Sequence, residues 1–313
     1  MSDNVLVCGS IAFDTIAVFE DHFSKHILPD NIHALSVSFF VPGLRKEYGG
    51  CAGNISYSLK KLGGNPLPVG TVGADADDYL AYMRDLGIDT RLVRVLPDMF
   101  TPQCFITTDL ANNQIASFHP GAMLKSAEND LTGNEAAWAI VAPDSKDAMF
   151  THARRLHAQG IPFVFDLGQA MPLFEGDDLN EMLTLARILT ANEYEASVIE
   201  QRTGRGMKQL ATEIEAVVVT RGARGATLYA GNQEITVAPV TASEIVDPTG
   251  CGDAHRAGLL YGLVNGWDLY DACCLANIMG SIKIASRGPQ NHQVQLAEIQ
   301  STLKQHYGLV RSF

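Results

Sequence analysis

The stretch DPTGCGDAHRAG at residues 247–258 decides how this sequence is interpreted. Segment 254–264 is predicted to be a helix, so Gly250, Cys251 and Gly252 stand at the N-terminus of that helix. The two glycines let the backbone turn free N–H groups outward, and the helix dipole adds partial positive charge. The stretch therefore predicts an anion hole that suits a phosphate group during transfer.

Asp253 lies in the first turn of the same predicted helix, beside the anion hole. A carboxylate aimed at a phosphoryl group can take a proton from an attacking hydroxyl, and such general-base help is worth about 10²–10⁴ in rate. The alternative is an ordinary glycine-rich loop in which Asp253 is only an acidic residue near a helix N-terminus. A bare GxGD motif would favour that alternative, whereas the whole run before a predicted helix favours the anion hole.

Outside this stretch, short apolar runs alternate with longer segments of helical spacing. The predicted strands are 5–8, 67–72, 139–142, 163–165, 188–190 and 217–220. The predicted helices are 55–62, 77–86, 148–159, 179–186, 254–264, 270–285 and 296–307. Repeated strand–helix alternation predicts an α/β fold with parallel βαβ units and helices on both faces of the sheet. Ligands of such sheets bind at the carboxyl ends of the strands.

Two segments break the alternation. The first contains SVSFFV at 36–41, and the second contains two runs of alternating residues, 103–108 and 114–118, around the polar turn 111–113. The second is predicted to be a β-hairpin. We expect both segments to form a small β lid inserted into the core, with the core at 1–11, 49–100 and 124–313 and the lid at 12–48 and 101–123.

Composition narrows the partners of the chain. It has 313 residues, of which 46% are hydrophobic and 19% charged, and a formal net charge of −12. Such a chain forms a sizeable core and repels nucleic acid on average, although backbone dipoles can still bind a small anion. We expect no membrane partner, because no apolar run is long enough to span a bilayer. The N-terminus lacks a signal-peptide pattern, and the six cysteines form no CxxC, so we expect a cytoplasmic protein with reduced thiols.

Four motifs together resemble one known family. DPTGCGDAHRAG resembles the C-terminal signature of the ribokinase-like (phosphofructokinase B-type) carbohydrate and nucleoside kinases, and GGCAGN at 49–54 resembles their N-terminal signature. Two further family landmarks match GSIAFD at 9–14 and NEYE at 192–195. The resemblance covers nearly the whole chain, and it implies a three-layer α/β/α core with a mostly parallel central sheet and a small β-sheet lid.

Two stretches resemble bacterial adenosine kinases in particular. They are FSKHILP at 23–29, running on to Ser38 and Phe39, and IASFHPGAM at 115–123. Arg256 in DAHRAG also suits that subgroup. The subgroup resemblance implies an adenosine substrate and a role in purine salvage.

The family resemblance implies a sugar site around Asp14, whose carboxylate can accept hydrogen bonds from two vicinal ribose hydroxyls. Gly49, Gly50 and Asn54 would complete the cradle, because the glycines permit close backbone approach and the amide both donates and accepts. The alternatives are an Asx turn for the aspartate and a flexible joint for the two glycines.

Four further residues are implied near the nucleoside. Ser10 and Ser38 would touch it, Gln169 matches a position near the base, and Phe118 lies on the lid segment expected to close over it. A lone serine is also a common solvated turn residue, so the two serines keep that alternative.

The nucleotide side of the site is implied by residues after the middle strands. Asn192 and Glu195 resemble the pair that orders Mg²⁺ and its waters against the ATP phosphates, and the glutamate would act through water. Their alternative is a helix cap. The turn TRGARG at 220–225 would line the phosphates and ribose with Thr220, Gly222 and Gly225, and Asn277 would lie against the adenine. The implied cofactors are ATP and Mg²⁺, with a monovalent cation as a further cofactor of many relatives.

Two cysteines depart from the family pattern. Cys251 occupies a position that commonly holds alanine or valine, where only the backbone N–H is needed. A helix N-terminus lowers the pKa of a thiol, so Cys251 is also a candidate for oxidation. Cys104 stands where adenosine kinases carry an aromatic residue that stacks on the purine. Phe105 beside it faces the other way in a strand, and Phe13, Phe39 and Phe118 are other stacking or core candidates.

The sequence thus predicts an ATP-dependent kinase that phosphorylates the 5′-hydroxyl of a nucleoside, adenosine first, giving AMP and ADP. The general base is Asp253, and the anion hole is the helix N-terminus 250–253. A ribokinase-like sugar kinase and an inosine–guanosine or cytidine kinase are alternatives within the same class. A catalytically silent nucleotide-binding regulator is the alternative of a different class. An exposed face of the lid sheet would let two chains pair as a homodimer.

Overall fold

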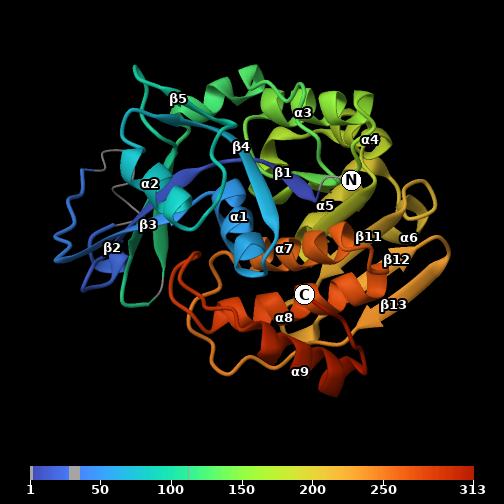
Figure 1. Cartoon of the computed structure of the whole chain (residues 1–313). Coiled ribbons are helices and arrows are strands. Elements are labelled where there is room, and N and C mark those ends of the chain that lie inside the picture. The colour runs from blue at the N-terminus through green and yellow to red at the C-terminus, as the bar shows by residue number, and fades with distance from the viewer. Residues whose placement is uncertain (1–2, 28–35, 112) are drawn as a thin grey trace.

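A large, mostly parallel sheet forms the centre of the molecule (Figure 1). The computed structural model describes residues 3–27, 36–111 and 113–313, and within them nine strands follow the order β13-β12-β11-β10-β9-β8-β1-β4-β5. All pairs from β5 to β11 are parallel, and β12 and β13 extend the sheet antiparallel. Their bounds are β1 Asn4–Cys8, β4 Asn65–Gly73, β5 Val93–Leu96, β8 Trp138–Val141, β9 Phe163–Asp166, β10 Ile188–Asn192, β11 Ala216–Thr220, β12 Ala226–Ala230 and β13 Gln233–Val237.

Helices cover both faces of this sheet, which confirms the predicted α/β class. Residues alternate along β1, so that Val5 and Val7 pack on one apolar cluster while Leu6 and Cys8 pack on the other. The first cluster is covered by α1 Cys51–Lys61, α2 Asp77–Asp85, α7 Cys251–Val264, α8 Leu269–Ile284 and α9 Leu296–Tyr307. The second is covered by α3 Lys146–Ala158, α4 Gly176–Leu185, α5 Glu193–Thr203 and α6 Met207–Leu210.

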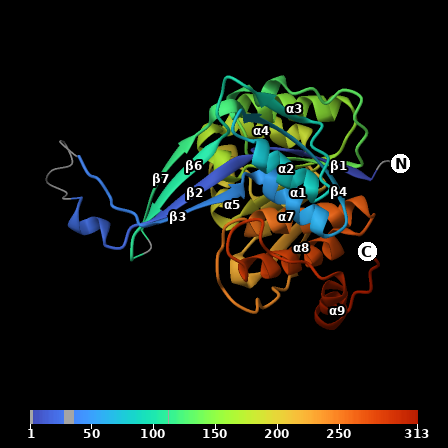
Figure 2. The same ribbon diagram turned by 60° about the vertical axis from the view of Figure 1, so that its left-hand side comes forward.

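A second, four-stranded sheet projects from the core (Figure 2). Its order is β3-β2-β6-β7, with β2 at Ala12–Val18, β3 at Gly43–Gly49, β6 at Gln103–Thr108 and β7 at Gln114–His119. The predicted hairpin is confirmed, because β6 and β7 pair antiparallel. Residues 36–41 form no strand. Residues 28–29 of the FSKHILP stretch and Asn112 of the hairpin turn lie outside the described residues.

The register of the small sheet decides which of its side chains share a face. Asp14 pairs with Glu47 on one neighbouring strand and with Cys104 on the other, and Cys104 pairs with Phe118. Residues directly opposite each other in a sheet point to the same side. Asp14, Cys104 and Phe118 therefore form one row on one face, whereas Phe105 belongs to the opposite face.

The cysteines and helix lengths agree with the sequence. All six cysteines are free, and Cys8, Cys273 and Cys274 are buried in the core. None of the helices in the described ranges is both long and apolar enough to cross a membrane.

Two glycines bring α7, the helix that follows the predicted anion hole, into close contact with α8. A Cβ atom at Gly258 would lie 2.7 Å from the Cα of Ala276, and one at Gly262 would lie 2.6 Å from the Cβ of Ala272. These distances are shorter than van der Waals contact. The position of α7 therefore depends on residues without side chains.

Replacing Gly258 by alanine should separate the two helices. We expect Gly258→Ala to lower the free energy of unfolding by about 1–3 kcal/mol, the usual cost of overpacking. The matched control is Gly280→Ala on α8, where a Cβ would approach no closer than 3.8 Å to the Cys251 carbonyl. That control should gain up to about 1 kcal/mol from helix propensity. Urea denaturation measures both; equal effects would contradict the close helix packing.

Candidate active site

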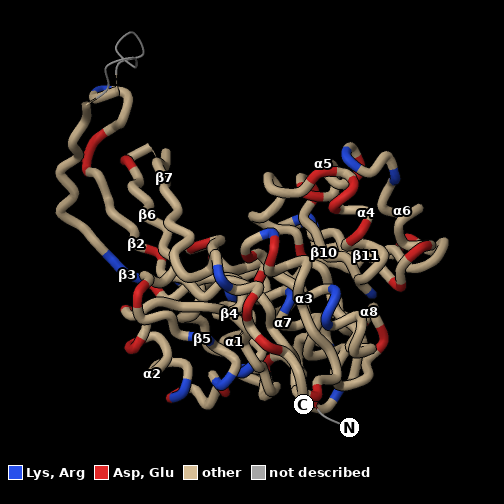
Figure 3. The backbone as a smooth tube through the Cα atoms, turned by 90° about the horizontal axis from the view of Figure 1, so that it is seen from above, with Lys and Arg blue, Asp and Glu red and all other residues tan. Residues whose placement is uncertain are grey.

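The predicted site residues gather where parallel strands of the large sheet end. Ser10 follows β1, Asn192 ends β10, and Thr220 ends β11 as the direct neighbour of Asn192. Figure 3 shows the small sheet and α5 extending from the core on the side away from the C-terminus. The strand ends therefore bring together residues that are far apart in the chain, as expected for a doubly covered sheet.

The two glycine motifs meet at this edge, because the N-termini of α1 and α7 converge there. Asn54 of α1 donates from Nδ2 to Oδ2 of Asp253 in the first turn of α7, over 2.8 Å. Both helices begin at a glycine with positive φ, Gly50 at 81° and Gly250 at 79°. A Cβ at Gly50 would lie 2.5 Å from the Ser10 carbonyl oxygen, so only glycine fits at the start of α1.

A buried hydrogen-bond network orients Asn54. The amide Nε2 of Gln290 donates to Oδ1 of Asn54 over 3.0 Å and to the Tyr79 hydroxyl over 2.6 Å. That hydroxyl donates to the Gly49 carbonyl over 2.7 Å. Asn54 must therefore turn its NH₂ group towards Asp253. Gln290 and Tyr79 were not found from the sequence, because a glutamine in a loop and a tyrosine in an amphipathic helix carry no motif.

Asp14 lies close to this junction. A Cβ at Gly49 would approach Oδ2 of Asp14 to 2.6 Å, so the glycine makes room for the carboxylate. Burial, followed by repulsion from Asp253, Glu47 and Asp247, raises the pKa of Asp14 to about 6. Burial also raises the pKa of Asp253, while Arg256 and the hydrogen bond from Asn54 oppose that shift. Two half-buried carboxylates thus face the same region, one from β2 of the small sheet and one from helix α7.

A buried ion pair lies behind the first turn of α7. Arg256 donates from Nη2 to Oδ1 of Asp166 over 2.5 Å, and its Nε also contacts that carboxylate. A side chain at Gly252 would collide with the Arg256 guanidinium. Burial raises the pKa of Asp166 to about 7, Arg256 opposes the shift, and Glu195 adds to it. The second glycine of the motif thus leaves room for the buried guanidinium.

Asn192 and Glu195 form a complete capping box at the start of α5. Oδ1 of Asn192 accepts from the Glu195 N–H over 2.9 Å, and the two glutamate oxygens accept from the Asn192 N–H and Nδ2 over 2.8 and 2.7 Å. No described group of three or more His, Cys, Asp or Glu residues could hold a metal. This donor set suits Mg²⁺ that keeps its water shell and not a cage of direct carboxylate ligands.

The other residues predicted to line the nucleotide also have structural roles within the protein. Gly225 has φ 82°, and a side chain there would collide with the Val237 carbonyl. Gly222 also has a positive φ, 56°, and a Cβ atom added there would meet no atom within 4 Å. Asn277 donates from Nδ2 to the carbonyls of Val237 and Ala238 over 3.2 and 2.9 Å. The amide group of Asn277 therefore ties α8 to the end of β13.

Several predicted nucleoside contacts are not brought to the junction. Ser38 and Gln169 are exposed, and no contact links either to Asp14 or Asp253 within the described residues. Phe118 is 51% exposed on the face of the small sheet that carries Asp14. Phe13 is a core residue, packed between Tyr48 and Tyr79.

Phe39 packs in a separate aromatic cluster, with its ring tilted against those of Phe19 and Phe23 at centroid distances of 4.8 and 5.0 Å. Phe118 is therefore the aromatic residue that the described small sheet presents on the same row as Asp14 and Cys104.

The expected low pKa of Cys251 is wrong. Burial raises the pKa of this thiol, and the nearby Lys283 opposes the shift only in part. Its Sγ lies 3.8 Å from the Asp247 carbonyl oxygen. The sequence argument considered only the helix dipole and omitted the desolvation of a thiolate.

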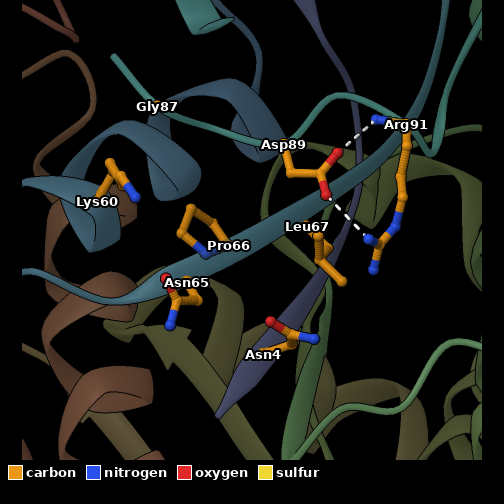
Figure 4. Close-up of a pocket in the computed structure, with 8 residues that line it drawn as sticks. All are labelled: Asn4, Lys60, Asn65, Pro66, Leu67, Gly87, Asp89 and Arg91. Atoms are coloured by element: carbon orange, nitrogen blue, oxygen red, sulfur yellow. Dashed lines mark hydrogen bonds and ion pairs between the residues drawn. The ribbon is translucent and has the colours of Figure 1, made fainter. Parts of the chain in front are cut away.

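A separate pocket lies at the other end of the sheet (Figure 4). It is lined by the first residues of β1 and β4, including Asn4 and Asn65, and by the loop after α2. Asp89 and Arg91 in that loop pair with each other, at 3.0 Å. This pocket lies at the amino ends of the strands, away from the glycine motifs.

Known proteins resemble the chain over nearly its whole length. A nucleoside kinase of Burkholderia thailandensis, solved in complex with inosine, is 44% identical and covers 98% of this chain and 99% of its own, with a TM-score of 0.88. The same enzyme solved in complex with ADP-inosine has a TM-score of 0.86 at 45% identity, covering 98% and 97%. A nucleoside kinase of Methanocaldococcus jannaschii is 27% identical over 87% of this chain and 90% of the relative.

Together with the match to a family model, these relatives show a kinase, a phosphotransferase with an alcohol group as acceptor. The pfkB family carbohydrate kinase model matches residues 3–295. The chain belongs to this family, as the glycine motifs predicted.

Proposed function

We propose that the protein is an ATP-dependent nucleoside kinase that transfers the γ-phosphoryl group to a 5′-hydroxyl. The observation that carries the proposal is the junction of Asn54 and Asp253, where two helix N-termini meet beside Asp14. The relatives from B. thailandensis and M. jannaschii, both named nucleoside kinases, support a nucleoside acceptor. Adenosine is the first candidate from the sequence, and inosine is the second because the B. thailandensis enzyme binds it.

The nucleoside is held by its ribose in this proposal. Asp14 accepts from the vicinal hydroxyls, and Asn54 and the Gly49–Gly50 backbone complete the cradle, with Ser10 next to them. The Gly50 backbone can approach a sugar closely because no side chain intervenes. Phe118 belongs to the same row of the small sheet as Asp14, which supports its proposed role in covering the base.

Asp253 then takes the proton of the 5′-hydroxyl as the phosphoryl group transfers. The N–H groups at residues 250–253 would absorb the developing charge, because the first N–H groups of a helix have no partner within the helix. Of these, the Cys251 N–H also donates to the Pro248 carbonyl, over 3.1 Å. Magnesium supplies charge neutralisation on the phosphates when bound, and Glu195 and Asn192 would orient its waters. Thr220, Gly222, Gly225 and Asn277 would line the nucleotide.

In this proposal the small sheet belongs to a lid that closes over the nucleoside and excludes water from the site. The core comprises 1–11, 49–100 and 124–313, and the lid comprises 12–48 and 101–123. Closure of the lid over the nucleoside, with Ser38 and Phe118 in the moving part, would suppress ATP hydrolysis.

The proposed function predicts the behaviour of one substitution. Asp253→Asn should lower kcat by about 10²-fold or more with KM little changed, because the general base is lost while shape is kept. The assay is phosphotransfer from ATP to adenosine, inosine, guanosine, cytidine, ribose and fructose 6-phosphate. Transfer to no nucleoside would sink the proposal, and a normal kcat of the variant would remove Asp253 as the base.

The raised pKa of Asp14 predicts a pH dependence. Asp14 accepts hydrogen bonds from hydroxyl groups with both of its oxygens only when it is ionised. Its pKa of about 6 means that it gains a proton as pH falls through that value. We expect kcat/KM for the nucleoside to fall below pH 6. Asp14→Asn should raise the KM for the nucleoside. It should also shift the acidic side of the pH profile of kcat/KM to lower pH, because the pKa of Asp253 falls when its negatively charged neighbour is removed. The exposed control Asp85→Asn should keep the acidic side of the profile near pH 6; an unchanged profile in Asp14→Asn would contradict the assignment.

The outer face of the small sheet is proposed to pair two chains. Leu44, Phe105 and Ile115 are exposed there, at 69%, 45% and 43%, on alternating positions opposite to Asp14. Burying them would form a homodimer through the lid. Static light scattering is expected to give twice the monomer mass, and Phe105→Lys is expected to give the monomer. A wild-type monomer at all concentrations would refute the pairing.

A further inference from the structure

Lys283 is a buried cation beside the proposed anion hole. It lies in the last turn of α8, and its side chain is completely buried, with 0% of its surface exposed. The other side chains of comparable burial and size are tyrosine, phenylalanine, leucine and isoleucine. An ammonium group in such surroundings loses its hydration, which costs several kcal/mol unless other groups replace the water.

Main-chain carbonyl oxygens replace that water. Nζ of Lys283 donates to the carbonyl of Asp247 over 2.9 Å and to the carbonyl of Ser286 over 3.0 Å. Ser286 follows the end of α8, where the helix dipole is negative and favours a cation. Burial lowers the pKa of Lys283, while Cys251 and Asp247 oppose the shift. The ammonium is thus bound as an ion between peptide oxygens.

These two carbonyls belong to the two segments that shape the anion hole. Asp247 begins the DPTGCG stretch, and its N–H also binds the Ile284 carbonyl, over 3.1 Å. Its carboxylate accepts from the N–H groups of Thr249 and Gly288, each over 2.9 Å. A Cβ at Gly250 would lie 2.9 Å from the Cβ of Pro289, which directly follows Gly288 in the loop after α8. Lys283 therefore joins the loop before α7 to the loop after α8.

We propose that the ammonium of Lys283 is a built-in monovalent cation that holds the anion-hole loop in its working shape. An ammonium and a potassium ion carry the same charge, and peptide carbonyl oxygens can replace the hydration shell of either. Lys283 is a positioning residue, because it acts through Asp247 and the backbone of Gly250 and Cys251. The inference rests on the proposed kinase function for its assay, and it goes further in stating that the enzyme needs no added monovalent cation.

The experiment compares wild type with Lys283→Ala, which removes the ammonium and leaves space between the two carbonyls for an added cation. Nucleoside phosphorylation is measured in choline chloride buffer with magnesium, with and without added potassium or ammonium. Wild-type kcat should be the same in all buffers. The variant should lose about 10- to 100-fold in kcat, the scale of a small misplacement of the reacting groups, with the KM for nucleoside unchanged. Potassium or ammonium should restore kcat in a saturable way.

Controls separate this inference from the proposed function and from misfolding. Lys208→Ala on α6, at an exposed lysine, should match wild type in every buffer. Tetramethylammonium at equal ionic strength should restore nothing, because it cannot fit between two carbonyls or donate to them.

Each outcome decides the inference. A wild type that phosphorylates no nucleoside refutes the proposed function. An active wild type that requires potassium refutes the inference alone, whether or not the variant folds. A folded Lys283→Ala with full kcat, or with a loss that no cation restores, refutes it as well. Thermal melting and calorimetric nucleoside binding establish folding.

Discussion

The hydrogen bond between Asn54 and Asp253 joins the two halves of the site. It connects residues 199 positions apart and fixes the first turn of α7 against the first turn of α1. Both helices point their N-termini at the same edge of the sheet. At the start of α1 the N–H groups of Cys51 and Ala52 donate to the hydroxyl and the carbonyl of Ser10, and the start of α7 faces the same region. Every other feature of the site follows from this meeting: the glycines at both helix starts, the position of Asp14, and the network through Gln290.

The side chains around the site are mostly negative, so its positive charge must come from other groups. Its side chains are mostly acidic, with Asp14, Asp166, Glu195, Asp247 and Asp253 close enough to affect one another's pKa or that of Arg256. A nucleotide is an anion, and the chain itself carries a net charge of −12. Attraction must therefore come from backbone N–H groups and from a few buried cations. Arg256 and Lys283 supply that positive charge from behind the loop, where they shape the backbone and leave the open side to the ligand.

Much of the fold was predictable from the sequence, because each buried strand is an apolar run and most helices show 3.6-residue spacing. The misses are instructive. Helix α5 begins directly after β10, so Asn192 ends a strand and caps a helix with no loop between them, and the pattern shows no boundary. Strands β12 and β13 form the antiparallel edge of the sheet. β12 (ATLYA) is mostly buried but contains no continuous run of large apolar residues, and in β13 (QEITV) only Val237 is buried.

The candidate site was predictable where a motif fixes backbone shape and unpredictable where long-range packing decides. Glycines and their neighbouring carboxylates have local signatures, so Gly50, Gly250 and Asp253 could be named. Gln290, Tyr79 and Lys283 act through partners that are far away in the chain, and their residue types have no required spacing. The prediction of a low pKa for Cys251 was wrong for the same reason, because the burial of a side chain cannot be inferred from its neighbours in the sequence.

Capping and ligand binding are compatible roles for Asn192 and Glu195. In the capping box both glutamate oxygens already accept hydrogen bonds from Asn192, which holds the carboxylate in one orientation. Each carboxylate oxygen has two lone pairs, so each can still accept from one water molecule. A magnesium ion that retains its water shell needs acceptors of this kind, fixed in place and not in direct contact. The cap therefore prepares the carboxylate for an outer-sphere role, and the same four-residue motif serves the helix and the ligand.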